Sequence, residues 1–157
     1  MNIYEKITIP MIEEKWSYII ASQAVFMDTN ISEDCIDYVI NRCRDENIPL
    51  YIDPISSAKA KKLPHRLEGV EVLMLSQKEA EVLSEVKIES IDDCETATDK
   101  IRKRGVQKVI ILLSDQGVYY SSPNESGHLS PFNTDILDVT GASDAFSSFT
   151  IYGLLHE

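Results

Sequence analysis

The alternation of short apolar runs with amphipathic stretches constrains the fold of this chain more than any other feature. Runs of mostly apolar residues recur along the chain, separated by stretches in which apolar residues return at helical spacing. Continuous apolar strands that alternate with helices are typical of a parallel sheet with helices on both faces. The pattern predicts a three-layer α/β/α, Rossmann-like fold with a mainly parallel sheet. Its strands are expected at 24–28, 49–53, 70–75 and 108–113.

The amphipathic stretches predict helices around these strands. In the final helix, we expect Phe146, Phe149, Tyr152 and Leu155 to face inward. Before that helix, the pattern changes to a short antiparallel hairpin with its turn at 122–125. The expected helices are 10–22, 32–46, 57–62, 76–85, 91–104 and 141–155, and the expected hairpin strands are 117–121 and 127–130.

Composition and charge argue against several classes of function. Hydrophobic residues make up 43% and charged residues 26% of the chain, as in ordinary globular proteins rather than disordered ones. The net charge of −11 repels phosphate backbones, so we expect no nucleic-acid partner. Three cysteines without a CxxC pair disfavour a metal site or a disulfide framework. No stretch approaches the roughly 20 apolar residues of a membrane span. The N-terminus shows no signal peptide, so we expect no membrane partner and a cytoplasmic location.

The basic cluster of the chain consists of Lys59, Lys61, Lys62 and Arg66. A solvated helix face is the interpretation that we favour from the sequence. A local anchor for an anionic ligand is the alternative.

The strongest chemical signal is the stretch 138–146, with the sequence DVTGASDAF. Its small residues stand between a strand-like run and the final helix, so backbone N–H groups at the helix N-terminus can point at an anion. Asp144 lies in the first helical turn, where its carboxylate could accept a proton from a hydroxyl that attacks a phosphoryl group. By shape alone, an equal alternative is that Gly141 permits a tight turn and Asp144 stabilises the helix N-terminus.

This stretch resembles the DTxGAGDAF signature of the PfkB/ribokinase family of carbohydrate and nucleoside kinases. The resemblance implies that Asp144 is the catalytic base and that Asp138 lies near a monovalent-cation loop. It also implies a backbone anion hole for the γ-phosphate of the nucleotide, in which Ser143 replaces a glycine of the family. By this resemblance, the nucleotide-binding positions at the helix start are Thr140, Gly141, Ala142 and Ser143.

A second stretch, LSQKEAE at 75–81, resembles the PNxxEAE motif of the same family. The glutamate of that motif helps to order a Mg²⁺–phosphate–water network, which implies this role for Glu79. Ser76 takes the place of the family's asparagine on the nucleotide side. The same Ser76-x-x-Glu79 spacing is also that of a helix capping box, which is the structural alternative.

A third stretch, VIILLSDQGVY at 109–119, resembles the VTLGxxGVY strand–turn–strand that lies beside the nucleotide in the family. It implies nucleotide-binding positions at Ser114 and Gly117, with Ser114 in place of the first glycine. An ordinary hairpin turn with Gly117 in a left-handed conformation is the alternative.

A fourth stretch, DPISSAKA at 53–60, resembles a DPVSxxKA stretch of pseudouridine-kinase-like members. In sheets of this class, ligands bind at the carboxyl ends of the strands. Lys59 faces either phosphates or solvent, and solvent is the more common environment of a lysine. The residues expected along this ligand-binding edge are Asp28, Asp53, Ser76, Ser114 and the region near Asp138.

Together, the matches extend roughly over residues 7–155 and imply one partial ribokinase-like domain over 1–157. The family's N-terminal substrate and lid region and its C-terminal helices have no counterpart here. The resemblance implies an ATP-dependent phosphotransferase that acts on a sugar or nucleoside hydroxyl with Mg²⁺, and K⁺ is a further candidate cation.

Because the substrate contacts of the family belong to the region without a counterpart here, we expect weak kinase activity from this chain alone. We also expect a homodimer or a partner chain that supplies the missing half. The alternative is a degenerate nucleotide-binding or interaction module without catalysis, because Ser76, Ser114 and Ser143 all depart from the family motifs.

Overall fold

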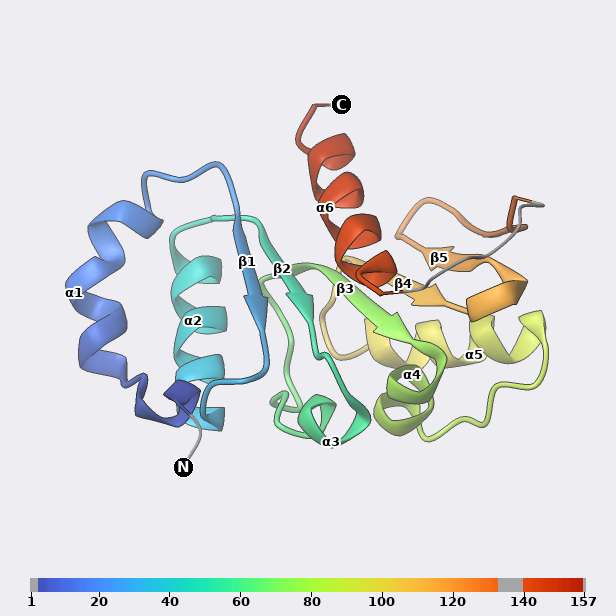
Figure 1. Cartoon of the computed structure of the whole chain (residues 1–157), viewed down its shortest axis with the longest axis horizontal. Helices are drawn as coiled ribbons and strands as arrows, with labels where there is room; N and C mark the ends of the chain where they lie inside the picture. Colours follow the sequence, from blue (N-terminus) through green and yellow to red (C-terminus); the bar gives the residue numbers. More distant parts are fainter. Residues whose placement is uncertain (1–2, 133–139, 157) are drawn as a thin grey trace.

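A six-stranded sheet forms the centre of the molecule (Figure 1). The computed structural model describes residues 3–132 and 140–156. The strands are β1 (Val25–Asp28), β2 (Leu50–Asp53), β3 (Val70–Ser76), β4 (Lys108–Leu112), β5 (Val118–Ser121) and β6 (Ser126–Leu129). Their order in the sheet follows their order in the chain. The first four pair in parallel, and β5 and β6 add antiparallel at one edge. The predicted mainly parallel sheet and its hairpin are confirmed.

Helices lie on both faces of this sheet. They are α1 (Ile9–Ile19), α2 (Glu33–Asp45), α3 (Ser57–Ala60), α4 (Gln77–Ser84), α5 (Ile91–Arg102) and α6 (Ala142–Leu154), with 3₁₀ turns at Ile3–Lys6 and Ser114–Gln116. Buried residues of α2, α4 and α5 belong to the core on one face, and α6 lies across the other. This is the predicted three-layer arrangement. No helix in the described ranges has the length and apolarity needed to span a membrane.

The helix starts follow local capping chemistry. Ser32 Oγ accepts a hydrogen bond from the backbone N of Cys35 at 3.4 Å, and capping boxes begin α4 at Ser76 and α5 at Ser90. Such side chains satisfy N–H groups that the first helical turn leaves without an intrahelical partner. The predicted starts of these three helices therefore agree with the structure. The stretches predicted for α1 and α5 run past the observed ends at Ile19 and Arg102.

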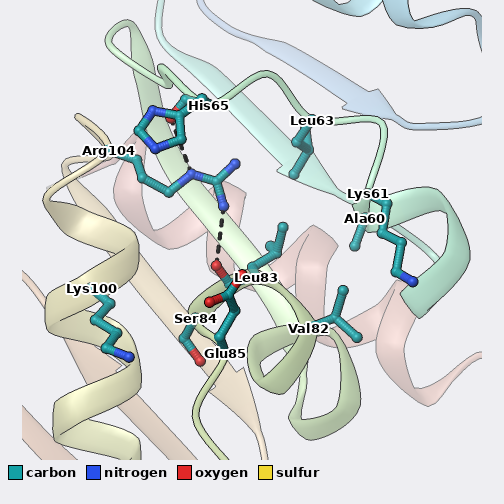
Figure 2. A pocket seen from close by; sticks show the side chains of 10 residues that line it. All are labelled: Ala60, Lys61, Leu63, His65, Val82, Leu83, Ser84, Glu85, Lys100 and Arg104. Carbon is teal, nitrogen blue, oxygen red and sulfur yellow. Dashed lines mark hydrogen bonds between the residues drawn. The ribbon is translucent and has the colours of Figure 1, made fainter.

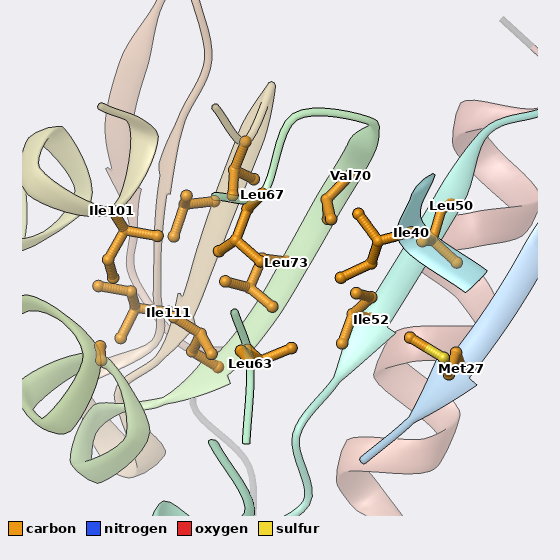
Figure 3. Packing of buried hydrophobic residues seen from close by; sticks show 14 of the residues in the cluster. Met27, Ile40, Leu50, Ile52, Leu63, Leu67, Val70, Leu73, Ile101 and Ile111 are labelled. Atoms are coloured by element: carbon orange, nitrogen blue, oxygen red, sulfur yellow. The ribbon is translucent and has the colours of Figure 1, made fainter. Parts of the chain in front are cut away.

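The main core lies between the sheet and the layer of α2, α4 and α5. Figure 3 shows Met27, Ile52, Leu73 and Ile111 from successive strands, with Ile101 from α5 beside them. All five side chains are buried. Apolar burial contributes about 25 cal/mol per Å² removed from water, so this layer holds each parallel strand in place.

The second face of the sheet is only partly covered. Tyr51 and Met74 are buried on this face, where Ile151 and Leu154 of α6 pack against them. Phe26 of β1 pairs directly with Tyr51 in the parallel register and therefore points to the same face. Its side chain is 52% exposed. One helix thus forms the third layer in the described part of the chain.

The predicted inward face of α6 was wrong in part. Phe149 and Tyr152 are 77% and 63% exposed, whereas Ser147 is buried and Ile151 packs on the sheet. Phe146 is half-buried. The reason is that α6 carries apolar side chains around much of its circumference, so helical spacing alone does not select a face. Packing against the sheet selects it.

Candidate functional site

The carboxyl ends of the parallel strands form one edge of the sheet. Asp28 and Asp53 are register partners at the ends of β1 and β2, and Ser76 ends β3 beside Leu112 of β4. Ser114 follows β4 directly in a 3₁₀ turn. The predicted alignment of these polar residues along one edge is therefore confirmed.

A cavity of about 220 Å³ opens at this edge, beneath the start of α6. It brings together four of the predicted site residues, which come from two distant parts of the sequence. Those four are Ser76, Glu79, Ser143 and Asp144, and the other lining residues are Asp53, Ile55, Met74, Leu75 and Leu112.

The start of α6 supplies the backbone groups of this site. Gly141 is the N-cap residue, with φ 75° and ψ 4° in the left-handed region, where a side chain costs roughly 1–2 kcal/mol. A Cβ there would meet no atom within 4 Å, so the backbone angle, not lack of space, calls for glycine. Ala142 and Ser143 follow in the first turn, whose N–H groups lack intrahelical partners and lie at the positive end of the helix dipole.

Ser143 itself lies inside α6 and has an ordinary negative φ. A serine at this position therefore needs no strained backbone, although it replaces a glycine of the family motif. Thr140 lies in the turn immediately before Gly141. Asp138, predicted near a cation loop, falls outside the described residues.

Asp53 and Asp144 place two carboxylates at the same cavity. Asp53 Oδ1 accepts a hydrogen bond from the backbone N of Ile55 at 2.9 Å, and Oδ2 accepts a longer one from Ser147 Oγ at 3.5 Å. Burial raises the pKa of Asp53 above its ordinary value, and the negative charges of Asp144 and Asp28 act in the same direction. The site therefore favours a positive charge or a proton beside Asp53.

Ser147 is a contact that the sequence did not reveal. It is only 3% exposed and joins α6, one turn after Asp144, to the end of β2. Its position three residues after Asp144 is the one signal that could have suggested this role.

Glu79 belongs to a capping box and also lines the cavity. Its Oε2 accepts a hydrogen bond from the backbone N of Ser76 at 2.8 Å, and Ser76 Oγ accepts one from the backbone N of Glu79 at 3.4 Å. The capping box is thus present. Glu79 is nonetheless 5% exposed and lines the cavity, and it forms no ion pair within residues 3–132 and 140–156. A buried carboxylate without an ionic partner is unusual. The hydrogen bond from the backbone N of Ser76 holds the Glu79 carboxylate at the cavity.

Ser114 and Gly117 lie at the same edge but do not line this cavity. Ser114 has φ 56°, a strained left-handed backbone at a position where the family has glycine. Gly117 has φ 91° and ψ −138°, so its φ is positive as predicted but it lies outside the left-handed helical region. A Cβ on Gly117 would come within 2.1 Å of the carbonyl oxygen of Leu129, so only glycine fits.

The lysines of the 53–62 segment hold a loop. Lys59 Nζ donates to Asn30 Oδ1, and Asn30 Nδ2 donates to Asp28 Oδ2 at 2.7 Å. Lys62 Nζ donates to the carbonyl oxygen of Ile31 at 3.0 Å. In this structure, Lys59 therefore faces the β1–α2 loop instead of solvent or a phosphate.

The described residues, 3–132 and 140–156, contain no group of three His, Cys, Asp or Glu side chains placed to hold a metal ion. Burial raises the pKa of the Cys43 thiol to about 11, so it stays protonated at neutral pH and is a poor metal ligand. Mg²⁺ usually binds through one or two carboxylates together with water and substrate phosphates. Glu79 and Asp53 fit Mg²⁺ of that kind, which would enter with a nucleotide.

Comparison with known proteins shows the family of this chain. The sequence profile described as pfkB family carbohydrate kinase matches residues 6–157. The chain belongs to the PfkB family. The motifs at 75–81, 109–119 and 138–146 all lie within this match, as the sequence predicted.

Curated relatives of the PfkB chain include two nucleoside kinases. Pseudouridine kinase of Escherichia coli (strain K12) is 30% identical over 146 residues, which are 92% of this chain and 46% of that protein. Guanosine-inosine kinase of Exiguobacterium acetylicum is 27% identical over 136 residues, 85% of this chain and 45% of that protein. The chain thus spans about half the length of the curated relatives that it matches.

Solved structures confirm the ribokinase-like fold. A candidate sugar kinase from Clostridium perfringens superposes with a TM-score of 0.87 at 24% identity, over 96% of this chain and 47% of that one. Arabidopsis thaliana ribokinase, solved with ribose and ATP, superposes with a TM-score of 0.75 at 17% identity, over 92% of this chain and 46% of that one. This chain therefore spans about half the length of each of these two structures.

Proposed function

We propose that this chain carries the nucleotide-binding half of a PfkB-type kinase, which transfers the γ-phosphoryl group of ATP to a hydroxyl of a sugar or nucleoside. The observation that carries the proposal is the cavity where Ser143 and Asp144 of α6 meet Glu79 of α4. A helix N-terminus, a carboxylate in its first turn and a fixed second carboxylate are the groups that phosphoryl transfer needs in one place.

In the proposed mechanism, Asp144 accepts the proton of the attacking hydroxyl. The N–H groups of Ala142 and Ser143 at the start of α6 stabilise the negative charge on the transferred group. Asp53 and Ser147 hold this end of α6 against the sheet edge. Positioning and charge stabilisation of this kind supply most of the catalysis of phosphoryl transfer.

Bound MgATP supplies the phosphoryl group and a divalent cation that offsets its charge. Glu79 would hold the cation through water, because its Oε2 already accepts the hydrogen bond from Ser76. Ser114 and Gly117 lie along the same edge, where they would border the nucleotide. A role of Asp138 with K⁺ remains a prediction from the motif.

The substrate class rests on the relatives, whose names include pseudouridine kinase and guanosine-inosine kinase. A nucleoside is therefore the favoured substrate, and a sugar is the broader class. We propose that the remainder of the PfkB fold, in the same polypeptide or in a partner chain, holds the hydroxyl opposite Asp144. Without it, the half described here binds nucleotide but transfers phosphate slowly.

Calorimetric titration of MgATP into the purified chain tests the proposal. We expect saturable binding that Gly141→Val abolishes, because valine strongly disfavours the left-handed backbone that aims the N–H groups. Gly153→Val is the matched control, since that glycine also has open space around it but an ordinary φ. Asp144→Asn should bind MgATP as the unmodified chain does.

Three results would count against the proposal. If Gly141→Val and Gly153→Val bound MgATP equally well, the start of α6 would not be part of the nucleotide site. When the other half of the fold is supplied, Asp144→Asn should lower the rate of nucleoside phosphorylation by about 10²–10⁴-fold, as loss of a general base does. An unchanged rate would show that Asp144 is not the general base. No phosphorylation by the unmodified chain together with the other half would instead support the alternative, a binding module without catalysis in which the serines Ser76, Ser114 and Ser143 have ended activity.

A further inference from the structure

A second pocket lies on the helical face of the sheet, away from the cavity beneath α6. It measures about 480 Å³ and lies between α3, the loop that follows it, the end of α4 and the end of α5 (Figure 2). The two cavities have no lining residue in common. A volume of this size is ordinary for a small-molecule site.

Arg104 is the central charged group of this pocket. Its Nε donates to the carbonyl oxygen of His65 at 3.1 Å, Nη1 to that of Leu83 at 3.3 Å, and Nη2 to that of Pro64 at 2.9 Å. A guanidinium has five N–H groups, so these three bonds leave one N–H on each Nη. The backbone bonds hold the side chain in one place and leave these two outer N–H groups outside the three bonds.

No carboxylate of the described residues compensates the charge of Arg104. The guanidinium makes no ion pair within 4.0 Å among residues 3–132 and 140–156, and burial lowers its pKa because its charge is partly desolvated. The carbonyl oxygens that it contacts are dipoles and carry no net charge. A partly buried cation held in this way favours an anion beside it.

Two lysines add to the positive charge of the same pocket. Lys61 lines it from the end of α3 and Lys100 from α5, and neither forms an ion pair within the described residues. Glu85 is the single acidic side chain among the lining residues. Three cations against one carboxylate reverse the sign of a protein whose net charge is −11. Such a local reversal concentrates small anions.

We propose that this pocket binds a small phosphate-bearing anion, with the outer N–H groups of Arg104 as its anchor and Lys61 and Lys100 on either side. This inference goes beyond the kinase function, because it concerns a separate site at the other end of α4 from the capping box. For Lys61, a member of the basic cluster, it favours the role of an anchor for an anionic ligand over that of a solvated helix face. The net charge of the whole chain leaves a free small molecule, not a nucleic acid, as the ligand.

Inorganic pyrophosphate is the probe for the test, with binding mapped by ¹H–¹⁵N NMR on the full chain. We expect saturable shifts of amides in 61–67, 82–85 and 100–104 at millimolar pyrophosphate. The double variant Lys61→Ala/Lys100→Ala should bind at least about tenfold more weakly, the scale of one lost hydrogen bond to a charged group. It keeps the carbonyl bonds of Arg104, so the fold is preserved.

The control variant Lys87→Ala/Lys103→Ala removes the same charge from exposed lysines outside the pocket and should keep the affinity. Equal weakening by both pairs would show a general charge effect and overturn the proposal. Shifts confined to residues 140–144 would place the anion only at the start of α6 and would overturn it too. Because Gly141→Val acts on the α6 site alone, it should leave pyrophosphate binding at Arg104 unchanged even if MgATP binding fails.

Discussion

Asp53 ends β2 at the point where α6 begins above the sheet, and that position alters its ionisation. Burial raises its pKa, and the charges of Asp144 and Asp28 raise it further. An aspartate whose pKa is higher in the folded state than in the unfolded state is ionised at a cost to stability. The free energy of unfolding therefore falls as the pH rises through the folded-state pKa.

Replacement of Asp53 by asparagine should remove this cost. We expect the stability of the unmodified chain to fall relative to Asp53→Asn as the pH rises from about 4, the ordinary aspartate value, through the raised pKa. Urea unfolding at a series of pH values measures the difference. Asp93→Asn is the control with the opposite sign, because a hydrogen bond from the Ser90 hydroxyl lowers the pKa of Asp93. In that comparison, the free energy of unfolding of the unmodified chain should fall relative to Asp93→Asn as the pH falls. The same direction of pH dependence in both comparisons would contradict the prediction.

Residue types could be assigned to the site from the sequence, but their contacts could not. Asp144, Ser143, Glu79 and Ser76 were predicted by motif, and all four line one cavity. The bond from Ser147 to Asp53 joins residues 94 positions apart and depends on where α6 packs. No local pattern encodes such a distance.

Among the elements, α1 is joined to α2 by a cluster of contacts around Trp16. Its Trp16 is buried, and Trp16 Nε1 donates to Glu46 Oε1 of the α2 C-cap at 2.8 Å. The guanidinium of Arg42 lies 4.4 Å from the centre of the Trp16 ring and donates to Glu13 at 2.7 Å. Cation–π and charged hydrogen bonds thus join α1 to α2 in one cluster.

Arg42→Ala should therefore release α1 before the rest of the fold. Hydrogen exchange should become faster for amides of α1, while α5 keeps its protection, because local opening needs only these contacts to break. Arg44→Ala is the matched control, since Arg44 pairs with its exposed neighbour Asp45 and does not contact α1 in the described residues. Equal acceleration in both variants would show that the Arg42 cluster does not hold the helix.

The same scale shows why helix starts are easier to predict than helix faces. Ser32, Ser76 and Ser90 cap their helices with side chains close in sequence, so the signal is local. The orientation of α6 depends on Ile151 meeting the second face of the sheet, which is a tertiary contact. Phe149 and Tyr152 are equally apolar, and the sequence offered no reason to place them outside.

At the scale of the whole molecule, the two faces of the sheet differ in how they are covered. One face lies under several helices, whereas the other lies under α6, with Phe26, Phe149 and Tyr152 exposed around it. Exposed apolar side chains of this kind favour contact with another protein surface.

Two copies of this chain should therefore associate through the α6 face. Phe149→Ser combined with Tyr152→Ser should weaken self-association in light scattering, with little loss of stability, because both side chains are already exposed. Met11→Ser is the control, since Met11 is also exposed but lies on α1. A monomer at high concentration before any substitution, or equal weakening by Met11→Ser, would contradict the expected interface.

The order of the strands has a consequence for how such a fold can be divided. Because each strand pairs with the next one along the chain, every boundary between strands is also a boundary in space. A sheet of this kind can be separated at any one connection into two contiguous pieces, each of which keeps all of its internal pairings. In a sheet whose strands are interleaved in another order, some cuts would leave a piece whose strands no longer lie next to one another. Sequential order thus lets a strand be added or removed at either edge of the sheet without breaking the pairings of the middle strands.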